Sequence, residues 1–235
     1  VMDPNNGEIL AMASDKSFDL NNPRDASSQF TSAEIQAFGE KEAMETYNRK
    51  NPDNKITIDQ VSAHFKQEEI MSYGQQVAWN NVWRNYAISD TYEPGSPSKI
   101  FTVSAGLEEG IINGNESYEC NGFMEVGGHT IKCVKRTGHG WLTVQEALME
   151  SCNVAMMKIA FAEKKEIFSK YQRIFGFGSK TGIDLPGEAD AASLVRFEDT
   201  MGSADLATNA FGQNYNCTMV QMAAAYASVI NGGSY

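Results

Sequence analysis

The sequence predicts a helix-rich α/β or α+β domain. Helical patterns that open on capping boxes are interspersed with short β-like runs, and hydrophobic residues make up 42% of the 235 residues, enough to bury a sizeable core. A Ser-x-x-Lys motif and a Ser-x-Asn motif lie in the middle of this pattern. A serine close to a lysine indicates nucleophilic serine chemistry, because a serine hydroxyl needs a neighbouring base.

The first third of the chain predicts a hairpin followed by helices. Val1–Ala13 has the pattern of two short strands around a turn. A capping box of Thr31 and Glu34 opens the first helical segment, and a second helical stretch runs from Thr57 to Trp83. We expect these helices to form an all-helical lobe inserted ahead of Ser96.

The rest of the chain predicts one more hairpin and further helices. Tyr118–Lys135 has Gly127–Gly128 between two β-like runs, which favours a hairpin. Thr143 and Glu146 form a capping box for a short helix, and a helical segment follows over residues 154–163. We expect a last helix to begin at about Thr218.

Ser96 lies where a helix is expected to start. Pro94 and Gly95 form a turn, Ser96 is a favoured N-cap, and Pro97 suits the first helical position. The apolar run up to Gly110 then predicts a helix of about thirteen residues.

Lys99 shares the first turn of this helix with Ser96. Residues three apart lie on one face, so the Lys99 amine is expected within hydrogen-bond reach of the Ser96 hydroxyl. Burial and the positive end of the helix dipole both disfavour the ammonium form, which would let Lys99 act as a base. The ordinary alternative is that Ser96 only caps the helix and Lys99 points into water.

Ser151 and Asn153 lie at the junction of two short apolar helices. There we expect Ser151 to relay a proton between Lys99 and a leaving group, and Asn153 to hold Lys99 and a substrate amide. The ordinary alternative is a helix break with Ser151 as a cap.

Seven segments, in order along the whole chain, carry a resemblance to a known family. They are Asp3–Ser14, Phe18–Pro23, Tyr92–Ser96, Glu150–Asn153, Phe175–Gly178, Gly182–Glu188 and Phe211–Gln213. Together they resemble the transpeptidase domain of class B penicillin-binding proteins, and the match is weakest between about residues 25 and 85.

The resemblance implies a serine transpeptidase/β-lactamase-like fold, with a mostly antiparallel sheet flanked by helices and an all-helical lobe. It makes residues 1–235 one transpeptidase domain that is incomplete at its C-terminus, with the last strands, an N-terminal anchor and a pedestal outside the chain. The family's third motif, Lys-Thr/Ser-Gly, is expected beyond Tyr235. We interpret Lys180-Thr181-Gly182 as a decoy, because Lys180 lies only 27 positions after Asn153.

The resemblance also implies a function, a peptidoglycan D,D-transpeptidase at the extracytoplasmic face of the membrane. Ser96 would attack the penultimate D-Ala of a stem peptide that ends in D-Ala-D-Ala, with Lys99 as base and Ser151 and Asn153 facing them. The acyl group would pass to an amine of a neighbouring stem peptide, and β-lactam antibiotics would trap Ser96. Cell-wall synthesis proteins are the implied partners. We expect weak or absent activity from residues 1–235 alone.

Two alternatives share the serine motifs. A serine β-lactamase also needs a glutamate that activates a deacylating water, and no Glu-x-x-Leu-Asn stretch follows Asn153. A β-lactam sensor would only be acylated, and the Asp3–Met12 opening argues against it.

Charge and hydropathy exclude two classes of partner. The net charge is −11 and no lysine or arginine cluster is present, so we expect no nucleic acid to bind. No run of eighteen apolar residues predicts a membrane span within the chain.

The four cysteines leave their pairing open. A Cys120–Cys133 or a Cys133–Cys152 disulfide is one possibility, and small buried thiols, Cys217 among them, are the other. A zinc site from Cys120, His129, Cys133 and His139 fits none of the usual structural spacings, so we expect no metal and no cofactor.

Overall fold

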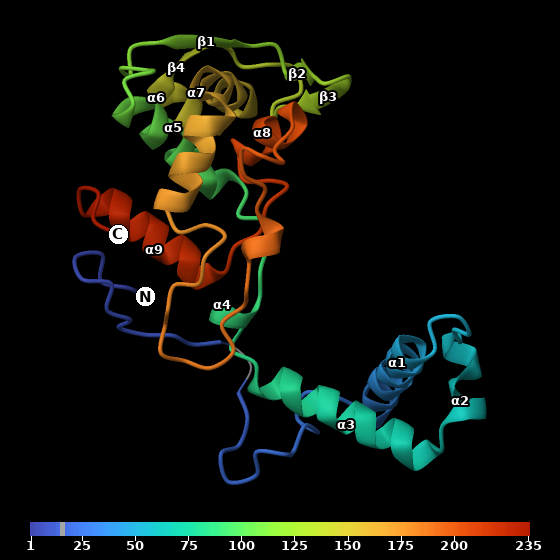
Figure 1. Ribbon diagram of the computed structural model, residues 1–235. Coiled ribbons are helices and arrows are strands. Elements are labelled where there is room, and N and C mark those ends of the chain that lie inside the picture. The colour runs from blue at the N-terminus through green and yellow to red at the C-terminus, as the bar shows by residue number, and fades with distance from the viewer. Residues whose placement is uncertain (15–16) are drawn as a thin grey trace. The chain divides into compact units, whose positions relative to one another are not determined.

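The computed structural model describes residues 1–14 and 17–235. The chain divides into two compact units, one of residues 1–12 with 87–235 and one of residues 13–86 (Figure 1). The second unit contains the helices that were expected ahead of Ser96, so the prediction of an all-helical lobe is confirmed.

Two long helices, α1 (Ser32–Lys50) and α3 (Gln67–Trp83), form the frame of the helical unit. The Thr31/Glu34 capping box opens α1 as predicted. The predicted helical stretch from Thr57 is divided into η1 (Ile58–Gln60), α2 (Val61–His64) and α3, because Phe65 adopts an extended conformation between the last two.

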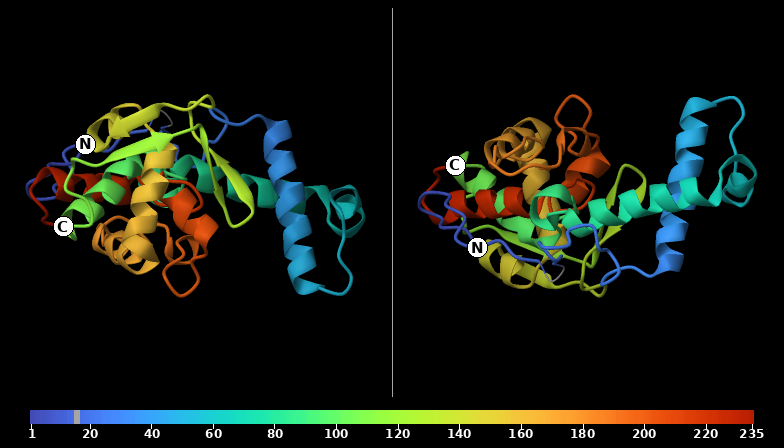
Figure 2. Two further views of the ribbon diagram at one scale, coloured as in Figure 1. Left: turned by 90° about the horizontal axis from the view of Figure 1, so that it is seen from above. Right: turned by 90° about the horizontal axis from the view of Figure 1, so that it is seen from below.

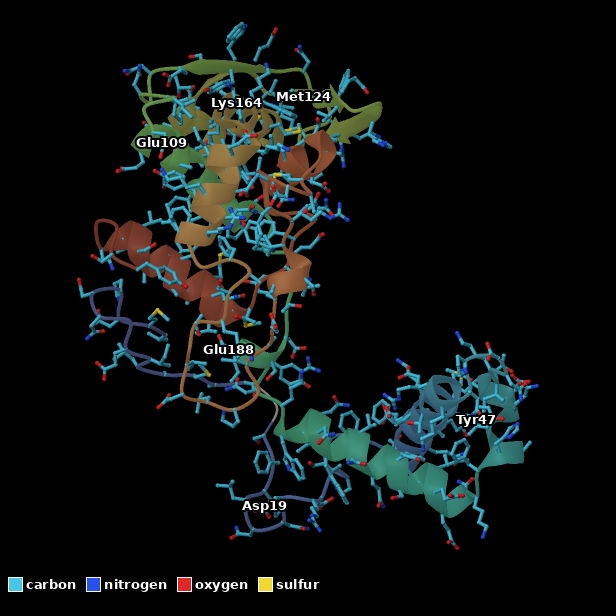
Figure 3. The ribbon with its side chains drawn as sticks, in the orientation of Figure 1. Asp19, Tyr47, Glu109, Met124, Lys164 and Glu188 are labelled. Carbon is cyan, nitrogen blue, oxygen red and sulfur yellow. The ribbon has the colours of Figure 1, made fainter. Side chains whose placement is uncertain are left out.

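The helices α1 and α3 cross at a pair of glycines. A Cβ atom on Gly39 would lie 1.9 Å from the carbonyl oxygen of Ile70, and one on Gly74 would lie 1.9 Å from that of Ile35. The backbones therefore approach more closely than any larger residue permits. A small apolar core lies beside this crossing, and Figure 3 labels Tyr47, which packs against it.

The larger unit is built around α7 (Asn153–Ile174), whose first half is buried. It packs against α5 (Lys99–Glu108) and α8 (Ser203–Asn209). The helix continues beyond the predicted residue 163, but Lys164 has φ +62°, so a kink separates its two halves (Figure 3). This unit also contains α6 (Val144–Met149), the short η3 (Ala192–Leu194) and α9 (Met219–Ile230).

The C-terminal helix α9 begins at its N-cap Thr218, as predicted. It runs beside the N-terminal segment (Figures 1 and 2), and the side-chain amide of Asn231 donates to the carbonyl oxygen of Pro4. The short helix α4 (Tyr86–Ser89) precedes the segment that leads to Ser96.

The strands form two antiparallel ribbons. β2 (Phe123–Val126) and β3 (His129–Lys132) make the hairpin predicted around Gly127–Gly128, and β1 (Ser117–Cys120) pairs with β4 (Gly140–Thr143) across α7 (Figure 1). The hairpin expected at the N-terminus is reduced to one bridge between Met2 and Ile9. One further bridge joins Tyr92 and Cys217. Within residues 1–14 and 17–235, the strands form two-stranded pairs and not the larger antiparallel sheet that the resemblance implies.

None of the helices in the described part of the chain combines the length and the apolarity that crossing a bilayer requires.

We expect Gly74→Ala to destabilise the helical unit. Alanine is the better helix former by about 1 kcal/mol, but its methyl group would overlap the Ile35 carbonyl, and such overpacking costs about 1–3 kcal/mol or more. Hydrogen exchange of the α1 and α3 amides measures the effect. Ser72→Ala, at an exposed position of α3, is the matched control and should leave exchange unchanged. Equal protection in both variants would contradict the close crossing.

Candidate active site

Ser96 opens a short 3-10 helix, η2 (Ser96–Ser98), which continues directly into α5. The N-cap is Gly95, with φ +65°, and not Ser96 as the sequence predicted. The Ser96 side chain is therefore not used in capping. It is exposed and meets two other side chains instead.

Lys99 turns its amine toward Ser96, as their spacing predicted. Its Nζ lies 3.2 Å from the Oγ of Ser96, 2.7 Å from the Oγ of Ser151 and 2.6 Å from the Ser151 carbonyl oxygen. The residue is only 2% exposed. Burial lowers the pKa of the Lys99 amine from 10.5 to about 8, although the nearby Cys133 and Cys152 act in the opposite direction.

Ser151 completes a triangle with these two residues. Its hydroxyl donates to the Oγ of Ser96 over 2.9 Å. Ser151 has φ +51°, in the left-handed region, and lies between the end of α6 and Cys152, the N-cap of α7. This conformation places both its carbonyl and its hydroxyl on the Lys99 amine.

Asn153 is the first residue of α7 and is 8% exposed. Its side-chain amide donates to the carbonyl oxygen of Lys132, at the end of β3, over 3.3 Å. The sequence predicted a contact with Lys99. The structure instead shows Asn153 fastening the β2–β3 hairpin to the start of α7.

Contacts from the C-terminal part of the chain support the turn that carries Ser96. The Gly95 amide donates to the Gly212 carbonyl over 2.8 Å, and a Cβ atom on Gly212 would lie 2.0 Å from the Gly95 oxygen. The Tyr226 hydroxyl donates to the Pro97 carbonyl, and Tyr215 shares a hydrogen bond with Ser98. Gly212 belongs to a segment that carried the resemblance, yet nothing in the sequence indicated that it contacts Gly95.

The Lys180-Thr181-Gly182 segment is not in a strand. The Glu188 carboxylate accepts from the amide and hydroxyl of Thr181 and from the amide of Gly182 (Glu188 is labelled in Figure 3). These contacts close a local turn. They agree with the interpretation of this segment as a decoy, which stays a prediction.

The four cysteines are free and buried. Cys133 and Cys152 are neighbours, with 3.9 Å between their sulfur atoms, and Cys120 and His139 complete a group of potential ligands. His129, which the sequence suggested as a partner, is instead an exposed residue of β3 and is not in this group.

Comparison with known families identifies the chain. Residues 1–235 match the family described as the penicillin binding protein transpeptidase domain. The chain belongs to this family. The match covers both compact units, and it confirms the resemblance to class B penicillin-binding proteins that the sequence motifs carried.

Individual members of the family agree. The chain is 40% identical over 152 residues to stage V sporulation protein D of Bacillus subtilis, which covers 64% of this chain and 23% of that protein. It is 32% identical to the peptidoglycan D,D-transpeptidase FtsI of Escherichia coli, over 65% of this chain and 25% of FtsI. The matched region thus spans about a quarter of these relatives.

A solved structure, the complex of penicillin-binding protein PBP2 and MreC from Helicobacter pylori, superposes with a TM-score of 0.57. The identity is 32%, and the match covers 67% of this chain and 32% of that chain. The fold of this chain is therefore that of the penicillin-binding protein transpeptidases.

We expect Gly212→Ala to displace Gly95 and Ser96 and to slow penicillin labelling at least about tenfold, since a shift near 1 Å at a reactive group has effects of that size or larger. The alanine would combine a φ of +83° with overlap of the Gly95 backbone. Gly114→Ala is the matched control, because Gly114 has a φ of +89° but nothing within 4 Å of its added Cβ. Equal labelling rates would show that the Gly95–Gly212 contact is dispensable.

Proposed function

We propose that this chain carries the nucleophile and the base of a peptidoglycan D,D-transpeptidase that acts through a serine acyl-enzyme. The observation that carries the proposal is the triangle of the Ser96 hydroxyl, the Lys99 amine and the Ser151 hydroxyl. The names of the relatives, among them a peptidoglycan D,D-transpeptidase, support the reaction class.

The triangle suits a neutral Lys99. A neutral amine has two N–H donors and one lone pair. The two shorter contacts, to the carbonyl oxygen and the Oγ of Ser151, use the donors, and the lone pair then faces the Ser96 hydroxyl at 3.2 Å. The Ser151 hydroxyl donates to the same Ser96 oxygen. A protonated Lys99 uses its third N–H to donate to Ser96. Once the amine is neutral, its lone pair takes the place of that N–H and Ser96 can donate to it, which is the geometry that a general base requires.

The acylation step follows from this arrangement. Lys99 takes the Ser96 proton while the serine oxygen forms a bond to the carbonyl carbon of the penultimate D-Ala. The bond from that carbon to the terminal D-Ala breaks, and the departing amine receives a proton from Lys99 through the Ser151 hydroxyl. The backbone N–H of Ser96, at the start of a helix, is the proposed donor to the oxyanion.

Transfer of the acyl group from Ser96 to the acceptor amine uses the same proton path in the opposite direction. The amine of a second stem peptide loses a proton to Lys99 as it attacks the ester carbonyl, and the Ser96 oxygen regains a proton. A β-lactam would acylate Ser96 in the same way, but its opened ring stays attached, so no leaving group makes room for the acceptor. Asn153, held at the base of the hairpin, is the proposed contact for a substrate amide.

The same family membership leads us to propose an extracytoplasmic location at the cell membrane and association with other cell-wall synthesis proteins. The Helicobacter pylori PBP2, which was solved in complex with MreC, supports the second part of this proposal.

Ser96→Ala should abolish covalent labelling of the full-length protein by a fluorescent penicillin, because the only other hydroxyl in the triangle, that of Ser151, accepts from Lys99 and so is not the proton donor to this base. Ser104→Ala, a half-buried serine elsewhere on α5, is the matched control and should label as the wild type does. Mass spectrometry of the labelled peptide tests the assignment. An adduct on any residue other than Ser96 would sink it, and rapid turnover of a chromogenic β-lactam would favour a hydrolase instead.

The acylation rate should rise with pH and level off above about 8. Only the neutral amine accepts a proton, and the pKa of Lys99 is lowered to about 8, so below that pH the rate should fall about tenfold per pH unit. Lys99→Met should lower the rate by about 10²–10⁴ and remove this pH dependence. Stopped-flow acylation across pH 6–10 is the measurement. A wild-type rate independent of pH in this range would rule out Lys99 as the base.

A further inference from the structure

We propose that Cys120, Cys133, His139 and Cys152 form a tetrahedral zinc site directly behind the serine triangle. Their ligand atoms, three Sγ atoms and one ring nitrogen, all lie within 4.8 Å of one another. The ion would not contact the substrate in the proposed acyl transfer, and the site would be a structural one with four protein ligands.

The separations fit a metal better than they fit a disulfide. Zinc bonds of about 2.3 Å to sulfur and about 2.0–2.1 Å to nitrogen give tetrahedral edges of about 3.8 Å between sulfurs and about 3.6 Å between sulfur and nitrogen. The Sγ of Cys133 lies 3.9 Å from the Sγ of Cys152 and 3.7 Å from the Nδ1 of His139. A disulfide would need about 2.05 Å between the sulfurs.

The four ligands come from separate elements that meet at this point. Cys120 ends β1, Cys133 follows β3, His139 precedes β4, and Cys152 is the N-cap of α7. Such convergence is typical of a structural metal that ties loops together, since a short ribbon by itself has little core.

Two glycines let the ligand loops touch. A Cβ atom on Gly122 would lie 2.1 Å from the Arg136 carbonyl oxygen, and one on Gly138 would lie 2.4 Å from that of Cys120. Both glycines have positive φ, +89° and +84°. The loop after Cys120 and the loop before His139 are therefore in backbone contact, which fixes the two ligands relative to each other.

Burial and hydrogen bonding also fit a metal. The exposed fractions of Cys120, Cys133 and Cys152 are 1%, 0% and 0%. The Ala155 amide donates to the Sγ of Cys152, a contact that a thiolate accepts well. Three soft sulfur ligands and one imidazole select zinc over magnesium or calcium.

The proposed ion would act on the Ser-x-Asn motif through Cys152, which lies between Ser151 and Asn153. Fixing Cys152 fixes the left-handed turn at Ser151 and the N-terminus of α7. Fixing Cys133 anchors the chain next to Lys132, whose carbonyl accepts from Asn153. The metal would therefore hold Ser151 and Asn153 in position without contacting either of them.

The test is the metal content of the full-length protein, purified under reducing conditions without chelator. Inductively coupled plasma mass spectrometry should find about one zinc per chain. Cys120→Ala and Cys133→Ala should each lose most of it, whereas Cys217→Ala should retain it. Cys217 is the matched control, because it is an equally buried free cysteine outside the group.

Two further measurements do not depend on the cysteine variants folding. Cobalt added to the metal-free wild type should give thiolate charge-transfer bands and the intense visible bands of tetrahedral coordination. His139→Cys should keep the zinc and shift these bands, whereas His139→Ala should weaken zinc binding at least about tenfold.

Any one of the following outcomes would overturn the site. They are less than about a tenth of a zinc per chain after dialysis against zinc, an octahedral cobalt spectrum, and equal zinc in Cys133→Ala and Cys217→Ala. A Cys133–Cys152 disulfide isolated from the purified protein would also exclude it. Metal content is measured without any acylation, so this result stands apart from the test of the transpeptidase proposal.

Discussion

The arrangement depends on one buried amine. The Lys99 amine lies between Ser96 and Ser151, and the residue is almost fully buried. Burial is the largest influence on the pKa of this amine. A lysine in this position is costly for folding unless its donors are satisfied, and Ser151 supplies two acceptors for them. The left-handed backbone at Ser151 is the structural requirement that follows, because it directs the carbonyl and the hydroxyl of one residue to the same amine.

The packing of α5 on α7 keeps Lys99 and Ser151 in register. At their crossing, a Cβ atom on Gly106 would lie 3.0 Å from a carboxylate oxygen of Glu163, which is fully buried. Burial raises the pKa of Glu163 to about 8, against the stabilising Gly106 amide, so this carboxyl is mostly protonated at neutral pH. The next residue, Lys164, kinks α7. The kink therefore begins directly after the residue of α7 that lies at the close crossing.

Local patterns predicted local structure well. The capping boxes at Thr31 and Thr143 and the glycine pair at Gly127 are each decided by a few consecutive residues, and each was predicted where it occurs. The Ser96–Lys99 contact was also predictable, because helical spacing alone brings residues three apart together. The error at the N-cap is local too, since Gly95, with its positive φ, took the position that Ser96 was expected to fill.

What the sequence could not supply are contacts between segments far apart in the chain. The Gly95–Gly212 approach joins residues 117 positions apart, and no periodicity encodes such a pairing. The cysteine group illustrates the same limit. The spacing of Cys120, Cys133 and His139 matched no zinc motif, and His129 was a natural guess for the fourth ligand. That ligand instead comes from the Ser-x-Asn motif, through Cys152. Because Ser151, Cys152 and Asn153 are consecutive, a single turn of backbone contacts the Lys99 amine, the sulfur group and the β2–β3 hairpin. An interaction that fixes the backbone at one of these three residues therefore restricts the positions of the other two.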